Sequence, residues 1–283
     1  MEATEITVLD SVKAAFDFEV VKGPSTILHK GQLIEHKGHY GLVKEFPDGR
    51  RAESLDVSTK SSRYVPHSTD DVVALVEAAG EAFEGIGETK CTFRNAHHVC
   101  VSPSRDQRRA IFGTADNIFP RFMIRGGYDG RGFLATMGFY RDACDNLAML
   151  RQVEGTSVSI RQSWATLSDV ITELQSRELN MPEFLDQVYG QPQEDSKRSE
   201  KIHSNRTKAI FRRLSRERFH TGRGSMGGDF TVSAWEAYNA IQGYVQHDAS
   251  RKGSPNDFDR VIAASNDQHV RKAEKITMEL LAA

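Results

Sequence analysis

Apolar residues in the first part of the chain come in short groups between turn-forming residues, a pattern that predicts β-strands. Between residues 16 and 46, the groups FDFEVV, STILHK, QLIEH and HYGLVKEF are separated by Gly23-Pro24, Gly31 and Gly38. We therefore expect a meander of four strand segments here. Further strand-rich segments are expected at residues 90–104, 109–127 and 131–140.

A helix is expected between these two strand-rich regions. Apolar residues from Val72 to Phe83 recur at a spacing close to 3.6, which is typical of an amphipathic helix. Ser68 stands where an N-cap is expected, and Asp71 follows three positions later in the first turn, as in a capping box.

The glycine-rich segment FMIRGGYDGRGFLATMGFYRDACDNLAML, residues 122–150, raises the question of whether it binds a phosphate. Phosphate-binding glycine loops lie before a helix, because backbone amides at the helix N-terminus must face the anion. Here Gly126 to Gly132 lie between two strand-like segments, and no Lys-Ser or Lys-Thr pair follows. Asp129-Gly130 is a hairpin signal. We expect a hairpin, and then a helix that begins around residues 140–145 and carries Leu147, Met149 and Leu150.

From residue 151 onward the apolar spacing becomes helical. Helices are expected at Ser168–Leu179, at Met181–Tyr189 with Pro182 in the first turn, and at about 201–219, 231–248 and 257–281. The polar residues 190–200 predict an exposed linker or loop.

These patterns predict an α+β fold with an antiparallel, strand-rich N-terminal half, a helix packed on it, and a helical C-terminal half. We place the boundary at residue 150: residues 1–150 form the strand-rich region and residues 151–283 form the mainly helical region. At 283 residues the chain is long enough to bury a sizeable core as one integrated domain.

Charge is nearly balanced over the whole chain, at −2, but it is concentrated locally. Residues 197–224 hold ten Lys and Arg against two Glu, which gives +8, so the rest of the chain carries about −10. On a helix, Ile210, Phe211 and Leu214 form a narrow apolar stripe, and the basic residues project elsewhere. Such a face is suited to a run of phosphates, or alternatively to an acidic protein surface. The candidate phosphate contacts on this helix are Lys208, Arg212, Arg213 and Arg216.

A second basic set lies in the strand-rich region, among aromatic residues that could stack on unpaired bases. Its arginines are Arg105, Arg108, Arg109, Arg121, Arg125, Arg131 and Arg141. The aromatic residues are Phe112, Phe119, Phe122, Tyr128 and Phe133, and we expect at least three of these five to be buried. Tyr128, at the expected hairpin tip, is predicted to be exposed and to contact nucleic acid together with Arg125 and Arg131.

No convincing metal site, cofactor motif or catalytic residue is predicted. His97 and His98 are adjacent on an expected strand, so their side chains point to opposite faces. Carboxylates beside Cys144 would raise the pKa of its thiol, which argues against a nucleophile. Asp142 and Asp145 stand three apart and could hold magnesium, although such pairs are common by chance.

The three cysteines are too few for a disulfide framework, and no apolar run is long enough to cross a membrane. The acidic N-terminus has no signal-peptide pattern. We expect a cytoplasmic protein without membrane contact.

The segments GGYDGRGFLATMGFYRDACDNLAML and SAWEAYNAIQGYVQH together resemble the phage and plasmid-like family called domain of unknown function 932. In that family a late helix carries a Trp and an Asn-Ala pair and ends near a His, which matches Trp235, Asn239, Ala240 and His247. The early segment SSRYVPHSTDDVVALVEAAGEAF also resembles the family, so the likeness spans about residues 25–280. It implies a mobile-element protein and carries over no catalytic residue. From their helical spacing, we expect Trp235 and Asn239 to have a structural role.

The order of strands and helix is also similar to the core of phage single-strand annealing proteins. Our leading hypothesis is a homo-oligomeric protein that binds single-stranded nucleic acid, DNA rather than RNA, and anneals it without covalent chemistry. The alternatives are a structural or host-interaction protein, and a metal-dependent nucleic-acid enzyme that uses Asp142 and Asp145.

Overall fold

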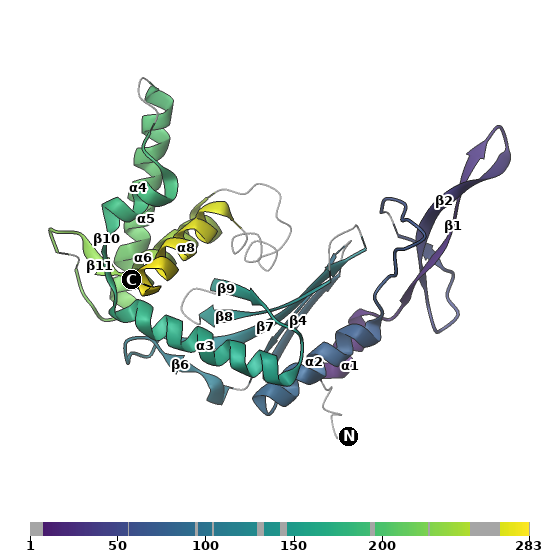
Figure 1. The fold of residues 1–283 in the computed structure, drawn as a ribbon, viewed down its shortest axis with the longest axis horizontal. Coiled ribbons are helices and arrows are strands. Elements are labelled where there is room, and N and C mark those ends of the chain that lie inside the picture. Colours follow the sequence, from purple (N-terminus) through teal and green to yellow (C-terminus); the bar gives the residue numbers. More distant parts are fainter. Residues whose placement is uncertain are drawn as a thin grey trace, which may run out of the picture. The chain divides into compact units, whose positions relative to one another are not determined.

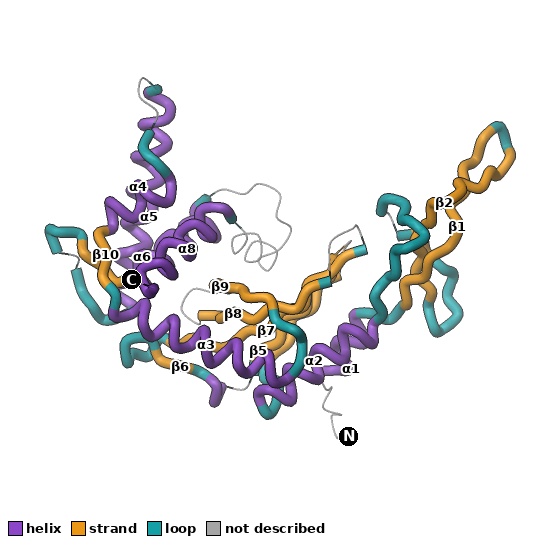
Figure 2. Tube along the Cα trace, viewed as in Figure 1, coloured by secondary structure: helices purple, strands orange, loops and turns teal. Residues whose placement is uncertain are grey.

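The computed structural model describes residues 8–55, 57–93, 96–103, 105–128, 133–141, 146–192, 196–225, 227–249 and 267–282 (Figures 1 and 2). The chain forms two compact units that interleave along the sequence. The first comprises Met1–Asp106, Arg121–Met137 and Gln152–Arg161, and the second comprises Gln107–Pro120, Gly138–Arg151 and Gln162–Ala283.

A long antiparallel ribbon is the most extended part of the first unit. Strands β1 (Glu19–His29) and β2 (Gln32–Glu45) form it, and the short strand β3 (Glu53–Ser54) pairs with β2 near its end (Figure 1). Lys30 and Gly31 make the turn with φ of 50° and 81°, the conformation of a tight hairpin.

The expected meander of four segments is therefore wrong, because two of its three turn signals lie inside strands. The pairing register shifts between Pro24 and Thr26, and Gly38 on the facing strand has a φ of 78°. A bulge at this point absorbs the extra residues without ending either strand.

Helix α2 (Thr69–Phe83) begins as the sequence predicts. The Ser68 hydroxyl accepts a hydrogen bond from the backbone N–H of Asp71 at 3.1 Å, and the Asp71 carboxylate accepts one from the backbone N–H of Ser68 at 2.7 Å. The apolar face of the helix is buried, and helix α1 (Val8–Ala15) packs against it.

A six-stranded sheet follows along the chain. Its strands are β4 (Glu88–Phe93), β5 (Ala96–Ser102), β6 (Arg109–Ala110), β7 (Asn117–Gly127), β8 (Leu134–Arg141) and β9 (Asn146–Gln152). The order is β4-β5-β7-β8-β9, with β6 beside β7, and the pairs β4–β5, β5–β7 and β6–β7 are antiparallel. A short 3-10 turn, η1 (Arg105–Gln107), precedes β6.

The glycine-rich segment connects two neighbouring strands, β7 and β8, as expected for a hairpin rather than for the start of a helix. The hydroxyl of Thr136 on β8 donates to the carbonyl of Met123 on β7 at 3.2 Å. Residues 129–132, with the expected Asp129-Gly130 turn, lie outside the described residues.

The helix expected from about residue 140 is wrong. Strand β8 continues to Arg141, and Asn146 onward form β9, which lies next to β8 in the sheet. The apolar residues 147–150 form too short a run to distinguish helix from strand by periodicity, and pairing with β8 decides the outcome.

The second unit is mainly helical. Its helices are α3 (Ser157–Ser176), α4 (Met181–Tyr189), α5 (Lys197–His220), α6 (Ala234–Gly243), the π-helical turn η2 (Tyr244–Asp248) and α8 (Gln268–Ala282). The first turns of α3 belong to the first unit. Helix α4 has the predicted bounds with Pro182 in its first turn, and α3 begins at Ser157 rather than Ser168. The short strands β10 (Glu178–Asn180) and β11 (Thr231–Ser233) pair with each other and were not expected. The predicted α+β class, with a strand-rich first half and a helical second half, is confirmed.

Helix α6 lies at the centre of the second unit, and all of its residues are buried. It packs against α5 and α8. The Trp235 ring lies 5.2 Å from the ring of Phe139, and the Asn239 side-chain amide donates to the Trp235 carbonyl at 2.9 Å. The predicted structural role of Trp235 and Asn239 is confirmed.

Candidate nucleic-acid interface

Helix α5 carries most of the basic segment. Its N-terminus is capped, and the charged residues at its two ends have the signs that the helix dipole favours. The Ser196 hydroxyl accepts a hydrogen bond from the Ser199 backbone N–H at 3.2 Å. Glu200 lies in the first turn, and Arg218 and His220 lie in the last. Ile210 and Leu214 are buried, so this part of the predicted apolar stripe holds the helix to the rest of the unit.

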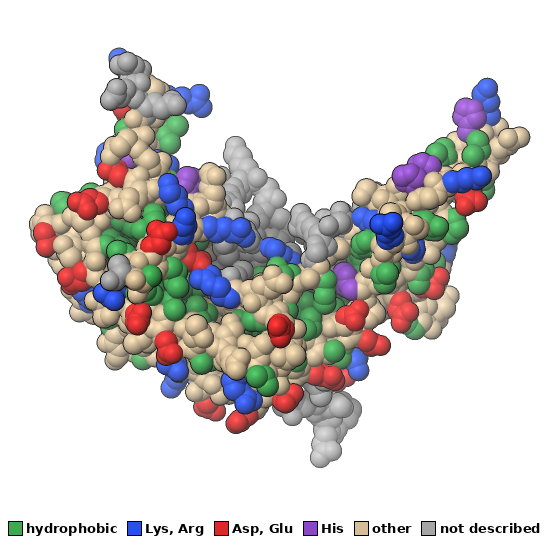
Figure 3. Space-filling model, viewed as in Figure 1, with side chains coloured by type: hydrophobic (Ala, Val, Ile, Leu, Met, Phe, Trp, Pro, Cys, Tyr) green, Lys and Arg blue, Asp and Glu red, His purple; other side chains and the backbone are tan. Residues whose placement is uncertain are grey.

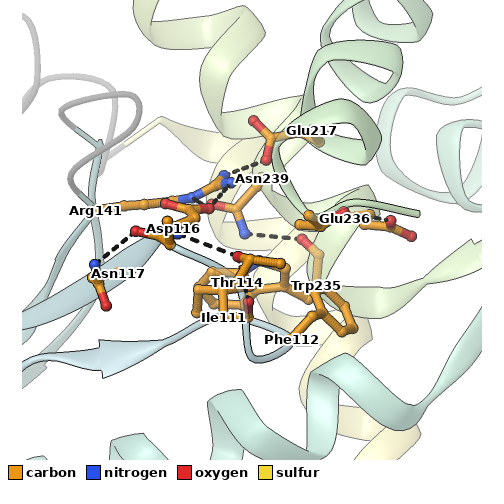
Figure 4. Close-up of polar contacts among 12 residues, drawn as sticks. Ile111, Phe112, Thr114, Asp116, Asn117, Arg141, Glu217, Trp235, Glu236 and Asn239 are labelled. Atoms are coloured by element: carbon orange, nitrogen blue, oxygen red, sulfur yellow. Dashed lines mark hydrogen bonds and ion pairs between the residues drawn. The ribbon is translucent and has the colours of Figure 1, made fainter. Parts of the chain in front are cut away.

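A buried ionic network fixes the C-terminal half of α5 (Figure 4). Arg141, at the end of β8, is fully buried between the carboxylates of Asp116 and Glu217. Its Nε donates to Asp116 at 2.8 Å, and its Nη1 donates to Glu217 of α5. Two buried acids around one guanidinium are stable only as a set, because either partner left alone would be an uncompensated charge. Arg141 is thus a structural residue and not a surface contact.

A second buried carboxylate ties the end of α5 to the start of α6. Glu236 accepts hydrogen bonds from the backbone and hydroxyl of Ser233 at 3.0 and 3.1 Å, which completes a capping box. Arg218 and Arg223 approach the same carboxylate at 3.3 and 3.5 Å. The exposed face of α5 is therefore held in a defined position.

This exposed face forms one wall of a groove of about 480 Å³, which we call the basic groove. The other wall is the turn η2. The lining residues are Ile202, Asn205, Arg206, Ala209, Arg212, Arg213, Arg216, Tyr244 and Asp248. Those from α5 recur at spacings of three and four, so they share one side of the helix. Lys and Arg side chains gather over this part of the second unit (Figure 3).

The four arginines of the basic groove differ in their contacts. Arg213 donates two hydrogen bonds to Asp248, at 2.6 and 2.9 Å, and this pairing holds the pKa of Asp248 below its usual value. The Arg206 guanidinium stacks 4.0 Å from the centre of the Tyr189 ring. Arg212 and Arg216 are exposed and form no salt bridge with any described residue.

Among the described residues that line it, the basic groove thus presents four guanidinium groups against one carboxylate. Guanidinium groups bind phosphate oxygens through paired N–H donors, and they remain charged at every physiological pH. Tyr244 adds a half-buried aromatic ring to the lining. This combination of cations and an aromatic surface is suited to a phosphodiester strand with accessible bases.

The structure gathers three of the four candidates predicted on α5. Arg212, Arg213 and Arg216 line the basic groove, whereas Lys208 is exposed on another side of the helix. Arg206 and Tyr244 also line the groove. Arg206 belongs to the basic face predicted on this helix but was not among the four named contacts, and Tyr244 was not predicted. Tyr244 comes from a later element, and no local pattern links it to α5.

The strand-region candidates that the structure describes do not form a comparable surface. The predicted exposure of Tyr128 is wrong: only 3% of the residue is exposed, and its ring stacks on His67 at 4.4 Å. The Tyr128 hydroxyl donates to the His67 carbonyl at 3.1 Å, so this aromatic residue fills the core. Arg121 is also buried, and Arg125 is half-buried.

The remaining strand-region arginines are only partly described. Arg108 and Arg109 are exposed, Arg105 lies in the turn η1, and Arg131 lies outside the described residues. The prediction that at least three of the five aromatic residues are buried is confirmed by Phe119, Phe122 and Tyr128.

The described residues contain no group of three or more His, Cys, Asp or Glu that could hold a metal ion. Asp142, Cys144 and Asp145 lie outside the described residues. Burial raises the pKa of Cys91 to about 11, which keeps this thiol protonated. No described helix is long and apolar enough to cross a membrane.

Comparison with known proteins finds one family model that matches the mainly helical part of the chain. The family model described as domain of unknown function (DUF932) matches residues 148–277, a range that contains the basic groove and the buried helix α6. The match begins at residue 148, near the end of the glycine-rich segment, so it does not cover the likeness noted for residues 25–147. No curated protein and no solved structure matches the chain. Over residues 148–277, the chain is therefore similar to the domain of unknown function 932 family.

Proposed function

We propose that this protein binds single-stranded nucleic acid in the basic groove, without covalent chemistry. The observation that carries the proposal is the gathering of Arg206, Arg212, Arg213 and Arg216 around Tyr244, with Asp248 as the only acid among the described residues of the lining. Phosphates would contact the arginines, and a base would stack on the aromatic ring.

The distribution of charge supports a local binding site. Residues 197–224 carry +8, whereas the rest of the chain carries about −10. A strand of phosphates is repelled by the acidic surface and attracted to the basic groove, which confines it to one path. Stacking on Tyr244 requires an unpaired base, so a single strand is the favoured ligand over a duplex.

The resemblance to mobile-element and annealing proteins extends the proposal. It favours DNA over RNA, a role in recombination or replication of a phage or plasmid in the host cytoplasm, and a homo-oligomer that holds one strand while its bases pair with another. Annealing needs only that the backbone be held and the bases be presented, and arginines that contact phosphates satisfy the first of these requirements.

The proposal is tested by removing charge from the basic groove and from a control surface. The groove variant is Arg212→Ala with Arg216→Ala, and the control is Lys272→Ala with Lys275→Ala on exposed positions of α8. Binding of a labelled single strand of about 40 nucleotides is followed by fluorescence anisotropy. Each lost phosphate contact lowers affinity about fivefold at 0.1 M salt, so the groove variant should lose roughly 25-fold. Equal losses in both variants would contradict the assignment.

An acidic protein segment is a second candidate ligand, because the basic groove already holds one carboxylate through Arg213 and Asp248. Competition distinguishes the two ligands. At the same total concentration of negative charge, an unlabelled oligonucleotide should displace more of the labelled strand than polyglutamate does. The reverse order would favour the acidic protein partner.

A further inference from the structure

The tip of the β1–β2 ribbon exposes four aliphatic side chains. Ile27, Leu28, Leu33 and Ile34 are 51, 70, 73 and 48% exposed. Ile27 pairs with Ile34, and Leu28 pairs with Leu33. Because successive residues of a strand point to opposite faces, one pair lies on each face of the ribbon. Figure 3 shows hydrophobic, basic and His side chains gathered at the end of the ribbon.

Exposing these aliphatic side chains to water is unfavourable in free energy. Strand β3 pairs with β2 only at Val43 and Lys44, so beyond the bulge no described strand pairs with either outer edge of the ribbon. Contiguous exposed aliphatic side chains and open strand edges mark a surface that binds another protein surface.

The second unit contains a groove with the complementary character. It lies between α4 and α5, has a volume of about 350 Å³, and we call it the apolar groove. Its lining residues are Pro182, Leu185, Asp186, His203, Thr207, Phe211 and Phe230. His203, Thr207 and Phe211 are four apart along α5, on a side of this helix that faces away from the basic groove. Phe230 is 42% exposed, so part of this apolar wall is uncovered.

We propose that the ribbon tip of one copy docks in the apolar groove of a second copy. Leu28 or Ile27 and their cross-strand partners would cover Leu185, Phe211 and Phe230. Lys30 at the turn would approach an acidic rim formed by Asp186 in the groove, with Glu183 and Asp229 beside groove residues. Opposite charges around an apolar centre are the usual layout of a specific interface.

One buried polar atom in the apolar groove also fits an incoming strand edge. His203 Nδ1 is buried and has no hydrogen-bond partner among the described residues. A buried polar group without a partner is destabilising, and an N–H or C=O group on an open edge of the ribbon could satisfy it.

The contact is heterologous, because it joins two different surfaces of identical chains. It therefore repeats from copy to copy and produces a ring or a filament rather than a closed two-fold dimer. The apolar groove and the basic groove lie on different sides of α5, so a docked tip would leave the basic groove open in every copy. The association is expected in the absence of nucleic acid, and its test is independent of the proposed function.

The first test is directed cross-linking in a mixture of two variants. Leu33→Cys places a thiol at the ribbon tip, and Thr207→Cys, carried on a chain with a larger tag, places one in the apolar groove. Each variant alone gives the background from the three native cysteines. Disulfide-linked pairs of unequal chains, formed only in the mixture, are the expected result. Linked pairs in Leu33→Cys alone would overturn the proposal in favour of tip-to-tip contact, and no cross-link in any sample would also overturn it.

Sedimentation velocity on folded protein gives the second test. Leu28→Ser with Leu33→Ser should reduce the assembly to monomers, whereas Val65→Ser, which changes a residue that is 82% exposed elsewhere, should not. Far-UV circular dichroism checks that the variants keep their secondary structure. A wild-type chain that is monomeric at all concentrations would refute the contact. An unchanged assembly with weakened nucleic-acid binding would also refute it and would assign the tip to nucleic acid instead.

Discussion

Asp248→Asn should strengthen nucleic-acid binding, although it removes an ion pair. Asp248 accepts two hydrogen bonds from Arg213 and is the only acid in the described lining of the basic groove. Asparagine keeps the shape of the side chain and one carbonyl acceptor but carries no charge. The substitution therefore raises the net charge of the groove by one and weakens the hold on Arg213, which can then turn to a phosphate.

The size of the effect follows from counterion release. Each additional phosphate contact on a single strand steepens the slope of log K against log salt by about 0.7. At 0.1 M salt this corresponds to about fivefold tighter binding, or roughly 1 kcal/mol. The cost in folding stability should be small, because half-exposed ion pairs contribute about 0.2–1 kcal/mol.

The assay is a set of anisotropy titrations of one labelled single strand at several salt concentrations. Arg213→Ala should bind more weakly than wild type, since it leaves Asp248 facing the phosphates. Arg213→Ala with Asp248→Ala preserves the net charge and should restore a slope close to that of wild type. If Asp248→Asn keeps both the affinity and the slope of wild type while remaining folded, phosphates do not enter the basic groove.

Three further predictions concern the folded state. Arg141→Met leaves the buried carboxylates of Asp116 and Glu217 without their partner. It should lower the unfolding free energy, measured by urea titration, by about 3–5 kcal/mol. Adding Asp116→Asn and Glu217→Gln to this variant should recover part of the loss. Burial lowers the pKa of His67 below its usual 6.5, so the folded state binds fewer protons there, and stability should fall as pH drops below about 6.5. This dependence should weaken in His67→Phe, and an identical pH profile of thermal unfolding in both proteins would disprove the assignment. Gly155→Ala should cost more than about 1 kcal/mol in the same urea titrations, because Gly155 has a φ of 80° and a Cβ there would overlap Leu75; a change below a few tenths would contradict this packing.

Local signals in the sequence predicted the elements whose stability is local. The capping box at Ser68, the first turn of α4 at Pro182 and the turn at Gly31 all depend on residues a few positions apart, and all three occur as expected. The same reasoning failed where long-range pairing decides the outcome. Gly38 lies in a bulge and not in a turn, because β1 continues beside it. Residues 146–152 form a strand and not a helix, because β8 lies beside them.

The candidate site was predictable in part for the same reason. Periodicity along α5 groups Arg212, Arg213 and Arg216, since a helix places such neighbours on one side. It could not show that Asp248 neutralises Arg213, that Tyr244 lies opposite, or that Arg141 is buried between two acids. Each of these facts depends on contacts between residues far apart in the sequence.

The most direct measurement is the salt dependence of binding to a labelled single strand by the wild-type protein, with a duplex of equal length as control. The described lining of the basic groove carries a net charge of +3, so it should contribute a slope of about −2 in log K against log salt. We predict tight binding at low salt, at least this steep a decline as salt rises, and a clear preference for the single strand. No binding to either ligand at about 0.05 M salt would contradict the proposed function.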